Sequence, residues 1–378
     1  VGQVFALLVL TVAAGEAAED RVSVASNWTL VWWRFRRHKL AMASLFVLAL
    51  LYAIVLFPAF FSTQDPERTD ARQAFVPMQM LHLFDDGGWD PWVAGIVGRR
   101  NPVTLRMEWK TDETRKVRVG FFVQGEPYSV LGLLTARTHL VGPRDGTERI
   151  FLLGSDRLGR DQWSRIMHAT QTSMTVGLIA VVLSTVLGVL LGGLSGYLGG
   201  KVDQVGQRLI ELLQSMPTIP IWLALSAALP RDWSPIQVFF AITVILSLIG
   251  WTTLAREVRG RFLSLREEDF VLAARLAGAS KLRIVMRHMV PTFSSHIIAT
   301  ASLAIPVMII NETSLSFLGL GIRPPAISWG VLLQEAQNIQ TLALAPWLLL
   351  PGLLVIVAVL AFNLVGDGLR DASDPYST

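Results

Sequence analysis

The chain has 378 residues, of which 52% are hydrophobic and only 16% are charged, with a formal net charge of +4. An ordinary soluble domain carries about 25% charged residues, so much of this chain is expected to lie in lipid. The sequence contains no cysteine, which excludes disulfides, thiolate zinc sites and cysteine nucleophiles.

The first 39 residues are predicted to form a cytoplasmic tail. Residues 1–15 are apolar but too short to span a bilayer, and they lack the basic segment of a secretory signal. We expect a dispensable extension there, with an interfacial or signal-like segment as the alternative. The tail ends in a basic and aromatic segment, residues 32–39, which is typical of the cytoplasmic interface of a membrane.

Six segments are apolar and long enough for a transmembrane helix, which needs about 20 residues. They are residues 40–61, 174–198, 209–229, 236–255, 292–315 and 346–365. Lysine and arginine gather before the first span, between the second and third, between the fourth and fifth, and after the last. This asymmetry predicts an all-α polytopic membrane protein with both termini in the cytoplasm.

Residues 62–172, between the first two spans, carry charges of both signs and many turn-forming residues. Segments 103–109 and 117–123 concentrate β-forming residues, so we expect a small β-containing extracytoplasmic domain. His82 and His139 lie in it near carboxylates, but without a recognised catalytic spacing, and structural roles are expected for both.

Residues 173–378 are predicted to hold the other five spans, and the second span carries glycines at intervals of four. These are Gly188, Gly192, Gly196 and Gly200. Small residues on one helical face let two membrane helices approach closely, either inside the subunit, as we expect, or at a seam between subunits. Pro217 and Pro220 interrupt the third span, and we expect a kink there, with a place in a substrate path as the alternative.

Three polar residues lie within or at the ends of the last two spans. Glu312 is near the outer end of the fifth span, where a structural hydrogen bond to a loop is the expected role and a functional charge is the alternative. Asn363 and Asp367 lie one helical turn apart near the inner end of the last span. We expect them to anchor that helix end.

Within a basic cytoplasmic region, residues 256–291, the segment 269–291 predicts a short helical hairpin. Its first helix has a face of small residues: Ala273, Ala274 and Ala277. Gly278 suits the left-handed conformation that ends a helix, Ser280 can cap the second helix, and Pro291 can begin the next span. The result would be a compact knob rigidly joined to a membrane helix.

On physical grounds this hairpin is either a coupling element or an ordinary basic loop, and the residues alone do not separate the two. A DNA-binding helix-turn-helix is disfavoured because a knob tethered by two spans could hardly enter a groove as a symmetric dimer.

The hairpin also resembles the EAA loop of binding-protein-dependent ABC importer permeases. The family pattern falls on Leu272, Ala273, Ala274, Gly278, His288, Val290 and Pro291. Leu272 stands where the family has glutamate and His288 where it has isoleucine, so no ion pair is implied at the first position. The resemblance implies shape complementarity to a groove on an ATPase subunit.

Three further segments resemble the second permease subunit of dipeptide, oligopeptide and nickel importers. The first precedes the second span and includes Gly154, Asp156, Gly159, Arg160, Asp161 and Arg165. The others are residues 312–321 and 366–371. We expect Asp156, Arg160 and Asp161 to order an amphipathic helix on the outer membrane surface, with docking of the binding protein as the alternative.

The resemblance implies the six-helix fold of an ABC importer permease in a bacterial inner membrane, with the β-containing domain inserted between helices 1 and 2. It implies lipid contact, a second homologous permease subunit, two ATP-binding cassette subunits that bind ATP and magnesium, and an extracytoplasmic solute-binding protein. No nucleic acid and no cofactor of this chain's own are implied. The implied function is passage of a peptide-like or related solute by alternating access, and peptides, nickel chelates and oligosaccharides remain open as cargo.

Other functional classes fit the sequence less well. The nearest approach to a phosphate loop is Gly200-Lys201, but Val202 follows where serine or threonine is required, so ATP hydrolysis by this chain is not expected. A secondary transporter usually shows internal repeats and ionisable residues at the bilayer midplane, neither of which is visible. A membrane-anchored enzyme would need a catalytic set in residues 62–172, and a sensor would need an output module.

Overall fold

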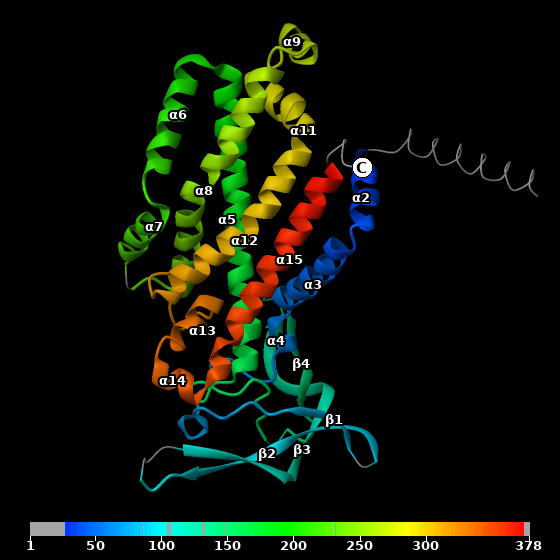
Figure 1. Ribbon diagram of the computed structural model, residues 1–378, viewed down its shortest axis with the longest axis vertical. Helices are drawn as coiled ribbons and strands as arrows, with labels where there is room; N and C mark the ends of the chain where they lie inside the picture. Colours follow the sequence, from blue (N-terminus) through cyan, green and yellow to red (C-terminus); the bar gives the residue numbers. More distant parts are fainter. Residues whose placement is uncertain are drawn as a thin grey trace, which may run out of the picture.

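The computed structural model describes residues 27–373, except residues 86, 104–106, 131, 133, 147 and 231. The apolar segment 1–15 lies outside this range. Long helices stand side by side, and a four-stranded sheet lies beyond one end of them (Figure 1). The short helix α9 lies at the opposite end, which is also the end where α15 finishes (Figure 1).

The first predicted span, residues 40–61, is divided between two helices, and a third helix precedes it. Helix α2 (Asn27–Arg37) precedes α3 (Lys39–Leu56), whose first turn is capped by His38 through a 3.0 Å bond from the Ala41 backbone N–H to Nδ1. Helix α3 stops before α4 (Pro58–Phe61). Pro58 has no N–H with which to continue the ladder of hydrogen bonds, so the predicted segment 40–61 is broken there.

A β-sheet follows, as the composition of residues 62–172 predicts. After a 3₁₀ turn, η1 (Ala71–Gln73), strands β1 (Leu81–Asp85), β2 (Gly88–Arg100), β3 (Met107–Val130) and β4 (Leu134–Pro143) form an antiparallel sheet in chain order. Its small core contains Val93, Val117, Val119, Val141 and Ile150. Residues 117–123 lie within β3, as do residues 107–109, whereas residues 104–106 lie outside the described part of the chain.

The two longest helices, α5 (Gln162–Leu198) and α8 (Pro235–Leu265), pack directly against each other. Three predicted packing glycines face α8: an added Cβ would lie 3.0 Å from the Trp251 carbonyl oxygen at Gly188, 2.3 Å from that of Ala255 at Gly192, and 2.7 Å from that of Arg259 at Gly196. The close approach is therefore within the subunit.

Gly200 does not belong to this packing face, and its assignment was wrong. Helix α5 ends at Leu198, Gly199 and Gly200 both have positive φ, and nothing lies within 4 Å of an added Cβ at Gly200. The four-residue spacing continued in the sequence, but two left-handed residues ended the helix first.

The predicted third span, residues 209–229, is not one kinked helix. Helix α6 (Gly200–Ser215) and α7 (Thr218–Ala227) meet at 86°. Met216 is extended, with φ −90° and ψ 140°, because a residue before proline is pushed out of the helical region. In the part of the chain described, five helices are long and apolar enough to cross a membrane, or six if this bent pair is one span.

The remaining helices follow in chain order. They are α9 (Asp269–Leu276), α10 (Lys281–Arg283), the π-helix η2 (Ile284–Met289), α11 (Val290–Thr292), α12 (Ser294–Phe317), α13 (Trp329–Glu335), α14 (Ile339–Leu344), the 3₁₀ helix η3 (Pro346–Leu349) and α15 (Leu350–Ser373). Helix α12 packs against both α5 and α15, and α15 packs against α3. These contacts place α5 at the centre of the helical part.

Candidate functional site

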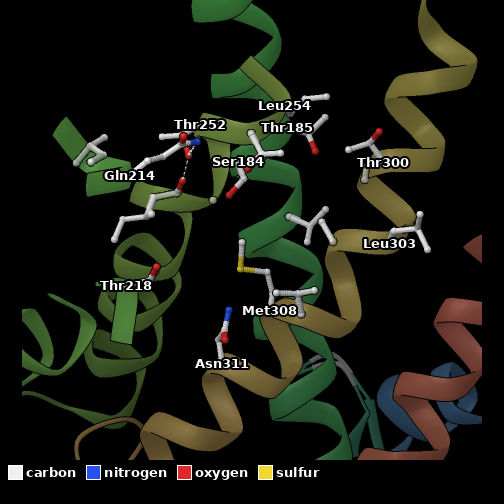
Figure 2. A pocket seen from close by; sticks show the side chains of 18 of the residues that line it. Ser184, Thr185, Gln214, Thr218, Thr252, Leu254, Thr300, Leu303, Met308 and Asn311 are labelled. Atoms are coloured by element: carbon white, nitrogen blue, oxygen red, sulfur yellow. Dashed lines mark hydrogen bonds between the residues drawn. The ribbon is translucent and has the colours of Figure 1, made fainter. Parts of the chain in front are cut away.

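A cavity of about 1120 Å³ lies among α5, α6, α7, α8 and α12 (Figure 2). Its wall combines apolar side chains such as Met308 and Leu303 with hydroxyl and amide groups. The polar set is Ser184, Thr185, Gln214, Thr218, Thr252, Thr253, Thr300 and Asn311. Such a wall can exchange hydrogen bonds with a polar but uncharged group of a solute.

Charged lining residues of the cavity are adjacent on α8. Arg256 donates to the side-chain oxygen of Gln214, whose amide nitrogen donates to Thr252 Oγ1 at 3.2 Å. Glu257 Oε2 lies 3.0 Å from His296 Nε2 and accepts from Thr300 Oγ1 at 3.4 Å. Arg256 and Glu257 therefore already have partners within the subunit.

The hairpin has the caps that its sequence predicts. Gly278 adopts φ +75°, and the Ala279 N–H donates to the Ala274 carbonyl oxygen at 3.1 Å, which completes a Schellman motif at the end of α9. Ser280 caps α10 by accepting from the Arg283 N–H. The turn is thus specified by residues next to each other in sequence.

Apolar residues fix this hairpin to the ends of the two longest helices. The buried hairpin residues are Val271, Ile284, Val285 and Met289. They belong to one cluster with Val258 and Phe262 of α8 and with Tyr197 of α5, and the Arg275 guanidinium lies 5.7 Å from the Tyr197 ring centre. A displacement of the hairpin would therefore be transmitted to α5 and α8 through packed side chains.

The opposite side of the hairpin faces outward. Leu276 is 89% exposed, and Leu272 and Ala273 are also exposed. Helix α9 therefore has one side buried against the subunit and one apolar side open at the surface.

Pro291 does not begin the following span, contrary to expectation. His288 is half-buried in η2, and Pro291 lies in the three-residue α11 rather than at the start of the long span. Phe293, with φ −116° and ψ 8°, separates α11 from α12. Because proline cannot donate a backbone hydrogen bond, the chain reaches α12 through a π-helix and a break.

At the other end of α5, a buried cluster of charges replaces the amphipathic surface helix that we expected. Asp156 is fully buried and Arg165 is 2% exposed. Asp156 Oδ2 accepts from Arg160 Nε at 2.6 Å and from Arg165 Nη1, and Arg160 Nη2 donates to Glu335 Oε1 at 2.8 Å. The charges lie inside the protein because they neutralise one another, and the cluster joins α5 to α13.

Two signature glycines, Gly154 and Gly159, and Asp161 shape the chain that leads into α5. The glycines have φ +74° and +71°, which only glycine adopts readily. Asp161 caps α5 by accepting from the Ser164 N–H at 2.8 Å, and from Thr63 Oγ1 at 2.9 Å. Burial raises the pKa of Asp161, and these hydrogen bonds oppose the shift.

Glu312 is fully buried in α12 and accepts from two serine hydroxyls, Ser173 Oγ at 2.8 Å and Ser316 Oγ at 2.7 Å. Ser316 Oγ in turn accepts from the Ile322 N–H, and Ser173 Oγ accepts from the Trp329 N–H. Hydrogen bonds through the Ser316 hydroxyl therefore link Glu312 to the loop that follows α12.

Asn363 and Asp367 do not anchor a helix end. Helix α15 continues to Ser373, so the backbone groups around both residues are already paired inside the helix. Asp367 is exposed, and within the described chain no side-chain hydrogen bond joins either residue to a neighbour.

The histidines of the inserted sheet have structural surroundings. His139 is buried, with Nδ1 2.9 Å from the Ser62 carbonyl oxygen and Nε2 3.0 Å from that of Glu126. His82 stacks on Trp92 at 4.3 Å. Neither histidine ring is hydrogen-bonded to a carboxylate in the described residues, and that range holds no group of three or more potential metal ligands.

Five or six helices of the described chain that are long and apolar enough to span a membrane, with a cavity among them, are the features of a polytopic membrane protein. Residues 188–376 match the family of the binding-protein-dependent transport system inner membrane component, and residues 26–78 match the N-terminal transmembrane domain of oligopeptide transport permease C. This chain belongs to the binding-protein-dependent transport system inner membrane component family, which confirms the resemblance found in its sequence.

Curated relatives extend the similarity over most of the chain. The oligopeptide transport system permease protein OppC of Bacillus subtilis is 28% identical over 363 residues, which cover 96% of this chain and 94% of the relative. OppC of Escherichia coli K12 is 42% identical over 223 residues, which cover 59% of this chain and 71% of the relative. A structure of the MetNI methionine ABC transporter in inward-facing conformations is similar over 55% of this chain and 95% of the MetNI chain. The identity is 16% and the TM-score 0.42, so the family assignment does not use this similarity.

Proposed function

We propose that this chain is the permease subunit of an ATP-driven importer and passes a peptide-like solute across the bacterial inner membrane by alternating access. One observation carries the proposal: the hairpin is packed onto α5 and α8, and the same two helices line the cavity. A force on the exposed side of α9 can reach the cavity wall through these packed side chains.

The proposal includes partners that this chain does not itself supply. Two ATPase subunits, which bind ATP and magnesium, contact the hairpins of two permease subunits through Leu272, Ala273 and Leu276. Gly278 allows the sharp turn from α9 to α10. Closure of the ATPase pair pushes the hairpins and opens the cavity toward an extracytoplasmic solute-binding protein. Each partner acts by favouring one of two states of the helical part.

The proposed topology places α9 and both termini in the cytoplasm. It places the inserted domain of residues 62–172, which contains the sheet, outside. The basic loops gather at the hairpin end of the molecule, in agreement with the excess of lysine and arginine found on the cytoplasmic side of membranes. A homologous second permease subunit completes the pathway.

A peptide backbone is the cargo that the cavity suits best. Peptide N–H and C=O groups recur along any sequence, and hydroxyls can donate to one and accept from the other. Each of the five helices contributes a hydroxyl or amide side chain to the cavity wall. Arg256 and Glu257 are already paired inside the subunit. The curated relatives are named for oligopeptide transport.

Site-specific crosslinking tests the coupling role. Because the chain has no cysteine, Leu276→Cys introduces a single thiol into this subunit on the exposed side of α9. In the assembly reconstituted with its ATPase subunits, we expect this thiol to crosslink to an ATPase subunit with a yield that changes when ATP is added. Ile339→Cys, at a position 82% exposed on α14, is the matched control and should not reach the ATPase. Crosslinking of neither variant, or of both alike, refutes the coupling role.

Uptake by proteoliposomes tests the cargo. Vesicles that contain both permease subunits and the ATPases, supplied with the binding protein and ATP, should accumulate labelled short peptides of unrelated sequence. Accumulation of a nickel chelate or an oligosaccharide instead would reject the peptide assignment while keeping the importer. Uptake driven by an ion gradient without ATPase subunits would reject the importer itself.

A further inference from the structure

Asn311 is an amide side chain inside a membrane helix. Helix α12 is one of the membrane-spanning candidates. At the helical rise of about 1.5 Å per residue, Asn311 lies roughly 26 Å along it from Ser294 and about 9 Å before Phe317. A polar group within a span normally faces protein or a water-filled cavity and marks function.

The Asn311 carboxamide has no partner inside the described part of the subunit. It carries two donor hydrogens and an acceptor oxygen, and burying such a group unpaired in an apolar medium is costly. Asparagines in spans therefore tend to form hydrogen bonds across helices. Asn311 is half-buried, yet neither its oxygen nor its nitrogen has a hydrogen bond in the described chain. By contrast, the next residue, Glu312, is fully buried and accepts from two serines.

The free amide belongs to the cavity. Asn311 lines the cavity one helical turn after Val307 and Met308, which also line it. Its amide projects from α12 into the space enclosed by the lining residues (Figure 2). The unpaired group is therefore directed at the proposed solute path and not at lipid.

The other amide side chain of the cavity wall is already engaged. Gln214 accepts from Arg256 through its oxygen and donates to Thr252 through its nitrogen at 3.2 Å. Of the two amide side chains that line the cavity in the described chain, Asn311 is thus the one whose donor and acceptor are both free for a solute.

A free carboxamide matches one residue of an extended peptide. Its acceptor oxygen and its donor nitrogen lie side by side, and an extended residue presents its own N–H and C=O on one edge, as it does toward an antiparallel strand. The two groups can exchange two hydrogen bonds whatever the side chain of the peptide residue is. Met308 adds a flexible apolar surface beside Asn311, which can adapt to side chains of different shape.

We propose that Asn311 recognises the backbone of the solute, with its carboxamide bound to the N–H and the C=O of one residue of an extended peptide. This inference rests on the proposed function and narrows it: the subunit selects for a peptide bond in the cavity and is indifferent to the side chain that the residue carries. A solute of similar shape that lacks the N–H is passed less efficiently.

A pair of solutes that differ in one N–H tests this assignment in the complete assembly. Proteoliposomes are supplied with ATP and with limiting amounts of binding protein loaded with trialanine, or with either of two analogues in which one amide is replaced by an ester. The ratio of initial uptake rates, amide over ester, is compared among the unchanged protein, Asn311→Leu and the matched control Gln214→Leu. Because the same binding protein delivers each solute to every variant, its own preference cancels in this comparison.

We expect Asn311→Leu to lower the amide-over-ester ratio by roughly 2- to 12-fold for one of the two esters, the range that one hydrogen bond is worth. Gln214→Leu should change the uptake of all three solutes by the same factor. An unaltered ratio in Asn311→Leu for both esters overturns the proposal, as does an equal change of the ratio in Gln214→Leu. If the unchanged protein takes up no trialanine at all, the proposed function is refuted, and this inference with it.

Thermal unfolding of the purified subunit in detergent separates recognition from a structural role. Asn311→Leu removes an unpaired amide from an apolar helix, so its unfolding midpoint should equal or exceed that of the unchanged protein. A lowered midpoint would show that the amide has a structural partner, and it overturns the proposal.

Discussion

Among single residues, Glu312 has a connecting role that its neighbours define. Its carboxyl accepts from Ser173 of α5 and Ser316 of α12, and each serine also accepts from a backbone N–H beyond α12. Glu312→Ala should lower the free energy of unfolding by about 1–3 kcal/mol, because buried donors lose their acceptor. Glu312→Gln keeps an acceptor oxygen and should lose less. Thermal unfolding of the purified subunit in detergent measures both, and equal losses would contradict this role.

Glu335 gives the protein a pH dependence of predictable sign. Burial raises the pKa of its carboxyl above the ordinary 4.5, and Arg165 and Arg160 oppose the shift. A raised native pKa means that the folded state binds this proton more tightly than the unfolded state, so this contribution to stability is complete below pH 4.5 and is lost as pH rises through the shifted pKa.

The corresponding experiment compares unfolding midpoints of the unchanged protein and Glu335→Gln from pH 4.5 upward. As the pH rises, the unfolding midpoint of the unchanged protein should fall relative to that of Glu335→Gln. Glu113→Gln, which alters an exposed carboxyl on β3, is the matched control. A pH-independent difference for Glu335→Gln would show that burial does not shift this group.

Residues that act locally could be predicted, whereas those that act across the chain could not. Gly278 and Ser280 were found because a left-handed turn and a helix cap depend on adjacent residues. Glu335 was missed because its partners Arg160 and Arg165 precede it by 175 and 170 residues, and nothing near it in sequence indicates a buried ion pair. Asp156 was placed on the surface because nothing in the sequence shows that its neighbours Arg160 and Arg165 are buried with it.

At the level of helices, the contact between α5 and α8 depends on glycine. An added methyl at Gly192 would meet the Ala255 carbonyl oxygen at 2.3 Å, a distance that no side chain tolerates, so the helices must separate. Gly192→Ala should therefore destabilise the subunit by about 1–3 kcal/mol, as overpacking does elsewhere.

Gly260 on α8 supplies the matched control for this change. It has nothing within 4 Å of an added Cβ, so Gly260→Ala should be neutral or should stabilise the helix by about 0.5–1 kcal/mol. Thermal unfolding of the two variants in the same detergent measures the contrast. Equal effects would mean that the glycines of α5 are not needed for close packing.

Helix positions were predicted well where apolar length decides them, and less well where proline does. The segments for α5, α8, α12 and α15 all lie within or close to the observed helices. Pro217 was expected to kink one span, but it produces a bend of 86° between two helices. Whether proline kinks or breaks a membrane helix depends on which neighbours satisfy the freed backbone groups, and that information lies in other segments.

For the whole molecule, the central prediction concerns the cavity that five helices share. Ala304 of α12 lines it, and Ala304→Trp would fill part of the proposed solute path. A passing solute would have to move the Trp ring aside, which adds about 1–3 kcal/mol to the barrier for transport. Uptake should therefore fall by roughly 5- to 150-fold.

The control for this change is Ile298→Trp, which places the same ring at an exposed position of α12 outside the cavity. It should leave uptake nearly unchanged, and both variants should assemble with their partners. Initial rates of peptide uptake by proteoliposomes decide the matter. Equal rates for both variants would place the solute path elsewhere.

The length of α5 has a mechanical consequence. Its 37 residues make a rod of about 55 Å, which exceeds the roughly 30 Å of bilayer hydrocarbon. The rod ends in the hairpin cluster on one side and in the Asp156–Arg165–Glu335 charge cluster on the other. Pivoting about its middle by about 10° would swing each tip by roughly 5 Å in opposite directions, so a modest movement of the hairpin end becomes an equal and opposite movement of the charge-cluster end without any helix changing shape.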